Sequence, residues 1–266
     1  MTTGSTQHTR THETARRPSV RAFTLIDVLV SIAVIGVLIS LMLPSIAMVQ
    51  ESARRIACSS DMRQFGLGLG MYAEDNDAEL LPSVYLTDTG ARTAQAYAPH
   101  LMDTVRTSPA DYDERPWGHW DGLGVLHAQN YITAPGVFYC PSHRGMSRAQ
   151  DLIPRWRQPA KDPLIANYQY RGVGPDGQRF IHQIDPDDAL VTDSVRSIDE
   201  LNHDDGFNVL AAGLSVRWFH DDGQVISSIM GRSGDEDEGQ SSTQAVADVV
   251  EREWAFFDGD APGSDD

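Results

Sequence analysis

The sequence predicts an α+β protein in which one long N-terminal helix packs against a small antiparallel β-sheet with long loops. Two observations support this fold class. Residues 28–50 form a run of 23 residues without a charge, which is long enough for a membrane-spanning helix. Much further along the chain, two short apolar segments flank a glycine-containing turn, which is typical of a β-hairpin.

The charge of the chain is strongly asymmetric. The formal net charge is −17 at pH 7. Residues 1–22 carry four arginines and one glutamate, a charge of +3, so the remainder of the chain carries −20. A domain that acidic repels nucleic acid, because binding needs a basic surface that neutralises phosphates. We therefore expect no nucleic-acid partner. Solubility explains the acidity better than calcium binding, which is the weaker alternative.

The uncharged run from Val28 to Gln50 predicts a transmembrane helix, since roughly 20 apolar residues cross the core of a bilayer. Arginines precede the run and acidic sequence follows it, so the N-terminus is expected in the cytoplasm and the C-terminal domain outside it. A buried core helix rarely has so long an uncharged run. A cleavable secretory signal, cut after Ser45-Ile46-Ala47, would have a shorter apolar region.

The apolar run continues into an amphipathic helix. Its apolar residues recur at spacings of four, three, four and three along one stripe, which comprises Cys58, Met62, Phe65, Leu69 and Tyr72. The predicted helix runs from about Phe23 to Ala73, with a kink or local melting at Pro44. Its outer half is expected to form the spine of a soluble domain.

The start of this helix resembles a known processing signal. The sequence Arg21-Ala22-Phe23-Thr24-Leu25-Ile26-Asp27, followed directly by the apolar run, is similar to the N-terminal signal of type IV pilins and type II secretion pseudopilins. The resemblance implies that a prepilin peptidase cuts between Ala22 and Phe23 on the cytoplasmic side and methylates the new amine. The family usually has Gly and Glu where this chain has Ala22 and Asp27.

Asp27 is a carboxylate one turn inside an apolar helix, where ionisable groups are costly and commonly functional. The resemblance implies that it pairs with the N-terminal amine of a neighbouring subunit during assembly. The alternative is that Asp27 lies at the level of the lipid headgroups, reaches water there and has no role in assembly.

Both cysteines lie in segments that resemble a large pseudopilin-like group. Cys58 ends the sequence Ala-Arg-Arg-Ile-Ala-Cys after the membrane helix. Cys140 lies in residues 122–145, which contain the group's Gly-Leu-Gly-x-Leu turn and Phe-Tyr-Cys-Pro-Ser. Two cysteines are too few for a structural zinc site of their own. In an oxidising compartment they could form one disulfide; two free, buried thiols are the alternative.

A later segment resembles a second motif of this group and keeps its His203, Asn208 and Trp218. An Asp-Gly pair of the group is replaced by Gly213 and Leu214, so the role of that pair does not carry over to this chain.

The residues themselves predict a β-hairpin here, with strands at Phe207–Ala212 and Ser215–Phe219. The sequence His-Asp-Asp-Gly recurs at 203–206 and 220–223, and we interpret it as turn chemistry rather than as a calcium site. The seven histidines beyond the leader form no His-x-x-x-His motif, and the sequence shows no nucleophile motif and no phosphate-binding loop. We therefore expect a protein that is not an enzyme and has no cofactor.

The predicted organisation has four parts. They are a basic cytoplasmic leader (1–22), a transmembrane helix (23–50), an extracytoplasmic pilin-like domain (51–230) and a C-terminal region (231–266). The C-terminal region consists of an acidic linker, a short helix (245–257) and a tail. The resemblance implies a structural subunit of a type II secretion pseudopilus or type IV pilus-like filament in a bacterial inner membrane. Its partners would be the prepilin peptidase, lipid, and other pilin-like subunits bound through the N-terminal helix. The alternative is a static, membrane-anchored extracytoplasmic binding protein.

Overall fold

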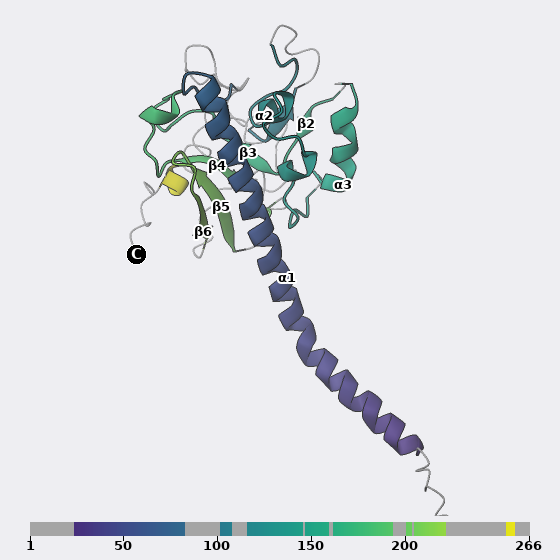
Figure 1. The fold of residues 1–266 in the computed structure, drawn as a ribbon. Coiled ribbons are helices and arrows are strands. Elements are labelled where there is room, and N and C mark those ends of the chain that lie inside the picture. The colour runs from purple at the N-terminus through teal and green to yellow at the C-terminus, as the bar shows by residue number, and fades with distance from the viewer. Residues whose placement is uncertain are drawn as a thin grey trace, which may run out of the picture. The chain divides into compact units, whose positions relative to one another are not determined.

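Figure 1 shows the computed structural model of the chain, which describes residues 24–82, 102–107, 116–145, 147–159, 162–193, 201–203, 205–221 and 254–258. The chain divides into two compact units, residues 1–48 and 49–266. Helix α1 (Leu25–Asp75) belongs to both units, and the described strands lie in the second. The predicted α+β class, with a long N-terminal helix and small antiparallel sheets, is confirmed.

Helix α1 is 51 residues long and matches the predicted helix to within two residues at each end. Pro44 lies inside it, and the helix continues on both sides without the local melting that the sequence allowed. The helix ends where Asp77 and Ala78 take positive φ angles of 52° and 65°. There the backbone N–H of Ala78 donates to the Ala73 carbonyl at 2.8 Å, which satisfies one of the last carbonyls of the helix.

The N-terminal part of α1 is apolar and uncovered. Every residue from Thr24 to Gln50 is exposed. Within the described part of the chain, α1 is the one helix that is long and apolar enough to cross a membrane. A continuous apolar surface of this kind needs lipid or the apolar surface of another molecule to cover it.

The C-terminal part of α1 forms the spine of the second unit. The five side chains of the predicted stripe are each at most 5% exposed: Cys58, Met62, Phe65, Leu69 and Tyr72. Glycines on the same side allow close packing, since a Cβ on Gly68 would lie 3.2 Å from Leu126 Cδ1. The cost of these glycines to the helix is therefore offset by contact with the rest of the domain.

The main sheet has four antiparallel strands in the order β3-β4-β5-β6. They are β3 (Tyr168–Tyr170), β4 (Ala189–Asp193), β5 (Gly206–Ala211) and β6 (Val216–His220). Strands β5 and β6 are the predicted hairpin, which is confirmed with boundaries shifted by one residue. Its turn closes with a bond of 2.9 Å from the Ala211 N–H to the Ser215 carbonyl.

A second, two-stranded sheet pairs β1 (Thr104–Arg106) with β2 (Leu164–Ile165). Strand β1 lies in the polar, turn-rich stretch from Glu74 to about Asp121, for which the sequence predicts an irregular loop region. Short helices fill the connections: α2 (Gly124–Ala128), η3 (Pro135–Phe138), α3 (Ala149–Leu152), η4 (Ile153–Arg157) and η5 (Ile181–Gln183).

The Gly-Leu-Gly turn before α2 needs both of its glycines. Gly122 has a φ of +47°, a backbone conformation that residues with a side chain rarely adopt. Gly124 packs directly on the backbone of β1, so that an added Cβ would overlap the carbonyl oxygen of Val105. The two glycines therefore allow helix α2 to start against the small sheet.

A helical turn at residues 254–258 packs onto the main sheet (Figure 1, yellow). Trp254 and Phe257 are at most 1% exposed and form a second core cluster with residues of β4 and β5. Asp258 forms a buried ion pair with Arg171 at 2.7 Å. The sequence predicts that this segment lies outside the domain, within residues 231–266. The turn instead completes the core, while most of the predicted 245–257 helix lies outside the described residues.

We predict that Gly124→Ala lowers the free energy of unfolding by about 2 kcal/mol or more, because the backbone of β1 cannot move away from the new methyl group. Gly136→Ala is the matched control: a Cβ there meets nothing within 4 Å, so a change below about 0.5 kcal/mol is expected. Urea denaturation of the full chain in detergent measures both variants. Equal effects at the two positions would contradict the packing argument.

Candidate functional site

A disulfide joins Cys58 on α1 to Cys140, which follows helix η3. The two Cα atoms are 5.3 Å apart although the residues are 82 positions apart in sequence. Both cysteines are at most 4% exposed. The bridge therefore fixes the loop after η3 to the central helix inside the core.

The side chain of His203, 1% exposed, lies directly beside this disulfide. Its Nδ1 is 2.8 Å from the Glu51 carboxylate on α1. Its Nε2 lies 3.6 Å from the Cys140 sulfur and 3.8 Å from the Asp193 carboxylate. One imidazole thus connects the helix, the disulfide and the end of strand β4.

Asp193 is the last residue of β4, and three nitrogen donors hold its carboxylate. The backbone and side-chain N–H groups of Asn208 donate to Oδ2 at 2.6 and 3.0 Å. The side chain of Asn202 donates to Oδ1 at 3.2 Å, and its own Oδ1 is 2.8 Å from His143 Nδ1. The motif residue Asn208 therefore positions a buried carboxylate.

Trp218 packs against the His203 ring of the network. It pairs with Asn208 across the β5–β6 hairpin, and its ring lies 5.4 Å from the ring of His203, edge to face. The Arg55 guanidinium stacks on the tryptophan at 4.3 Å and pairs with Asp205 at 3.5 Å. Motif residues that are spread along the sequence thus meet around the disulfide: His203, Asn208, Trp218, Cys58 and Cys140.

The pKa values of the two carboxyl groups in the network, Asp193 and Glu51, are shifted in opposite directions. Burial raises the pKa of Asp193 against the opposing charge of His203 and the hydrogen bonds from its asparagines. Burial also acts to raise the pKa of Glu51. Hydrogen bonds from His203 and Ser142, together with the charges of His203 and Arg144, outweigh burial and lower that pKa overall. The pKa values of the two carboxyl groups therefore shift in opposite directions although both contact His203.

Glu51, Ser142, Asp193 and Asn202 were not identified from the sequence. The Ser142 hydroxyl donates to Glu51 at 2.8 Å and so ties the loop after Cys140 to α1. Glu51 carries one visible signal, because it is the first charged residue after the uncharged run. Asp193 carries none, because a strand that ends in aspartate is ordinary.

The network also groups metal-binding side chains. Among the described residues, Cys58, Cys140, Asp193 and His203 place their ligand atoms within 4.8 Å of one another. While the two sulfurs are bonded to each other they are not thiolate ligands. In the oxidised chain, the network therefore serves to hold the loops and the sheet on the helix.

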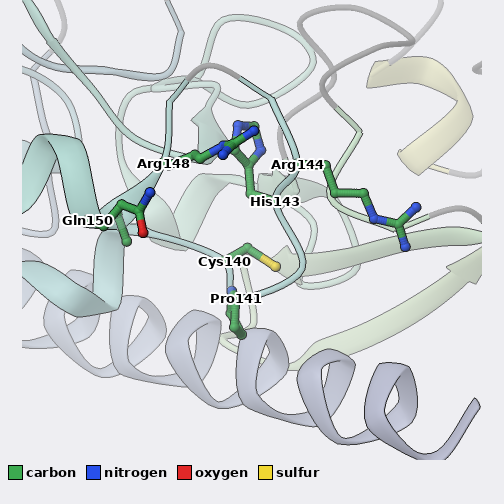
Figure 2. A pocket seen from close by; sticks show the side chains of 7 residues that line it. Cys140, Pro141, His143, Arg144, Arg148 and Gln150 are labelled. Atoms are coloured by element: carbon green, nitrogen blue, oxygen red, sulfur yellow. The ribbon is translucent and has the colours of Figure 1, made fainter. Parts of the chain in front are cut away.

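An open pocket of about 430 Å³ lies beside the disulfide (Figure 2). Cys140 forms part of its wall, together with Pro141, His143, Arg144, Arg148, Ala149 and Gln150. In this view His143 and Arg148 lie above Cys140 and Pro141 lies below it. Cys140 of the disulfide thus borders a space whose wall includes two arginines, on a chain whose net charge is −17.

Asp27, the predicted assembly residue, lies in the other unit and forms a capping box with Thr24. The hydroxyl and backbone N–H of Thr24 donate to Asp27 Oδ2 at 2.8 and 3.0 Å. The Asp27 N–H in turn lies 3.3 Å from the threonine hydroxyl. The predicted processing residues Ala22 and Phe23 lie outside the described residues, as do Asp204, Asp222 and Gly223 of the two acidic turns.

Comparison with known proteins gives a family and two curated relatives. The model of a family described as "Protein of unknown function (DUF1559)" matches residues 48–248. The type II secretion system core protein G of Pectobacterium carotovorum is 36% identical over 103 residues, which are 37% of this chain and 62% of that protein, less than two thirds of its length. The protein of the same name from Klebsiella michiganensis is 33% identical over 108 residues, 39% of this chain and 72% of that one. No solved structure gives a significant match.

We predict that thiol labelling of the unfolded, unreduced chain finds no free cysteine, because Cys58 and Cys140 are bonded to each other. Reduction should lower the free energy of unfolding by about 4 kcal/mol, the chain-entropy value for a loop of this length. The mass of the labelled chain and urea denaturation measure the two effects. Two labelled cysteines before reduction would reject the bridge.

Proposed function

The chain belongs to the family described as "Protein of unknown function (DUF1559)" and is pilin- and pseudopilin-like, and from this premise we propose that it is a structural subunit of a type II secretion pseudopilus or type IV pilus-like filament. In this role it performs no bond chemistry of its own. The observation that carries the proposal is the N-terminal part of α1, where every residue from Thr24 to Gln50 is exposed.

The length of this segment fits a bilayer. At 1.5 Å per residue, the uncharged residues from Val28 to Gln50 extend about 35 Å, against about 30 Å for the hydrocarbon core. Lipid would cover the apolar surface in the single subunit. In a filament, the same surface would be covered by the N-terminal helices of neighbouring subunits, so one segment serves for both anchoring and polymerisation.

The same proposal includes orientation and processing. The basic leader favours a cytoplasmic N-terminus in a bacterial inner membrane, with the folded domain on the other side. The disulfide supports this orientation, because such bonds persist in oxidising compartments. A prepilin peptidase would cut between Ala22 and Phe23 and methylate the new amine.

The position of the Asp27 carboxylate supports a role in assembly. Its Oδ2 is held at the first turn of the helix by Thr24. Within the described residues, no hydrogen bond engages Oδ1, so this oxygen can accept one from a cation outside the chain. The new amine of a neighbouring Phe23 would supply that cation inside the bilayer, where an unpaired carboxylate is costly.

One observation favours the alternative of a static membrane anchor. The capping box gives Asp27 a use within its own chain, because it satisfies an N–H group at the start of the helix. An anchored extracytoplasmic binding protein would keep this cap without assembling.

We predict that the protein purified from membranes of cells with a prepilin peptidase begins at Phe23. The reason is that a basic leader ends in a small residue directly before the Phe-Thr-Leu-Ile-Asp helix. Intact-mass and N-terminal peptide analysis provide the measurement. An intact Met1 leader, or a start at Met48 from cleavage of a secretory signal, would contradict processing of the pilin type.

We also predict that Asp27→Asn reduces crosslinking between neighbouring N-terminal helices about tenfold or more, because the amide cannot form an ion pair with the neighbouring amine. Asp27→Glu should retain crosslinking. Thr24→Ala is the matched control, since it removes the capping hydroxyl and leaves the carboxylate. Cysteine crosslinking in membranes compares the three variants. Equal loss in Thr24→Ala and Asp27→Asn, or no loss in Asp27→Asn, would favour the static anchor.

A further inference from the structure

The two cysteines of the disulfide and the adjacent His203 and Asp193 provide the donor atoms that zinc prefers. Two sulfurs, one imidazole and one carboxylate lie within 4.8 Å of one another, and all four residues are buried. Zinc is commonly bound by four such ligands in tetrahedral geometry. Neither cysteine spacing nor a His-x-x-x-His pattern reveals this set, because its members come from α1, the loop after η3, the end of β4 and the loop before β5.

The histidine is oriented as a ligand. The Glu51 carboxylate lies 2.8 Å from His203 Nδ1 and can accept a hydrogen bond from it. Nε2, the other ring nitrogen, faces the Cys140 sulfur at 3.6 Å and the Asp193 oxygen at 3.8 Å. These separations are close to those expected between ligands around one tetrahedral zinc with bonds of about 2.0–2.3 Å. A carboxylate behind the histidine is the usual support for such a ligand.

The carboxylate ligand is also held in place before any ion arrives. Three donors from Asn208 and Asn202 fix Asp193, and strand pairing fixes Asn208 opposite Trp218. A site with ordered ligands loses less conformational entropy on binding. The missing element is a thiolate at each sulfur. Two-electron reduction of the S–S bond supplies both thiolates, because each sulfur then carries a third lone pair and a negative charge.

Cys140 provides the entry path. It lines the open pocket of Figure 2, whereas Cys58 on α1 is not among the described residues that line it. The arginines that line this pocket, Arg144 and Arg148, favour an attacking thiolate and the thiolate that forms. We therefore expect a reductant and a metal ion to approach Cys140, which is 4% exposed, from this side.

We propose that reduction of the Cys58–Cys140 disulfide creates a four-ligand site for Zn²⁺, formed by the two thiolates, His203 Nε2 and the Asp193 carboxylate. An external dithiol supplies the two electrons. One of its thiolates attacks the Cys140 sulfur and the Cys58 thiolate leaves; the second sulfur of the dithiol then closes its own disulfide and releases the Cys140 thiolate. Binding of Zn²⁺ displaces the remaining thiol protons to solvent.

An external disulfide, acting as the two-electron oxidant through thiol–disulfide exchange, reverses the process, since formation of the Cys58–Cys140 bond removes both sulfur ligands at once. The chain would then hold zinc only before its disulfide forms, and the ion would keep the loop after η3 on α1 in the reduced precursor. This role is independent of the filament proposal, because it needs neither assembly nor processing.

The test compares the full-length protein in detergent in two redox states, each titrated with ZnCl₂ against a chromophoric chelator. The reduced chain, freed of reductant under argon, should bind about one Zn²⁺ per chain, and the oxidised chain less than about a tenth of that. Co²⁺ should give a thiolate charge-transfer band with the reduced chain only. Both measurements use the unmutated sequence, so failure of a variant to fold does not affect them.

Variants then assign the ligands. Cys58→Ser with Cys140→Ser should abolish binding under both conditions, and His203→Ala should weaken it about a hundredfold or more. Glu51→Gln, which alters a positioning residue, should weaken binding about tenfold and keep the Co²⁺–thiolate band. His182→Ala is the control, because His182 is exposed and lies in helix η5. No binding by the reduced chain, equal binding by both redox forms, or unchanged binding in His203→Ala would each overturn the proposal.

Discussion

One continuous helix has to suit two different surroundings, and the rest of the chain depends on how it does so. Residues 28–50 are uncharged and exposed, whereas residues after Glu51 alternate between a buried stripe and a polar face. The buried stripe begins at Cys58, about two turns after the turn that contains Glu51. The Glu51 carboxylate marks that turn and receives the first hydrogen bonds from the folded domain, through His203 and Ser142. The hydrogen bonds of Glu51 thus connect the loops of the folded domain to helix α1 directly after the uncharged run ends.

A covalent bond and a polar network together hold the loops and the sheet on helix α1, and they constrain different aspects of the geometry. The Cys58–Cys140 bond limits the distance between two segments but leaves their orientation free. The network around His203 and Asp193 adds directional hydrogen bonds, each made inside the core where an unsatisfied partner would be costly. This explains why sequence motifs so far apart in the chain share one location.

Much of this architecture could be predicted from local pattern. The helix, its buried stripe and the β5–β6 hairpin depend on side-chain periodicity and turn chemistry, which are visible in short windows of sequence. Strand β1 was missed because its partner β2 lies far along the chain and contributes only two residues. Asp193 and Glu51 were missed for a related reason. Their roles come from tertiary neighbours. Nothing in the local sequence marks Asp193, and the position of Glu51 directly after the uncharged run does not show which groups it contacts.

The helical turn at 254–258 has a consequence for where this domain ends. The family match stops at residue 248, yet Trp254 and Phe257 cover Phe207 and Val209 of the sheet. A fragment cut at the family boundary would leave that apolar face open to water and Arg171 without the Asp258 carboxylate, so it would tend to aggregate. Affinity tags, fusion partners and crystallisation boundaries for this chain therefore belong beyond residue 258.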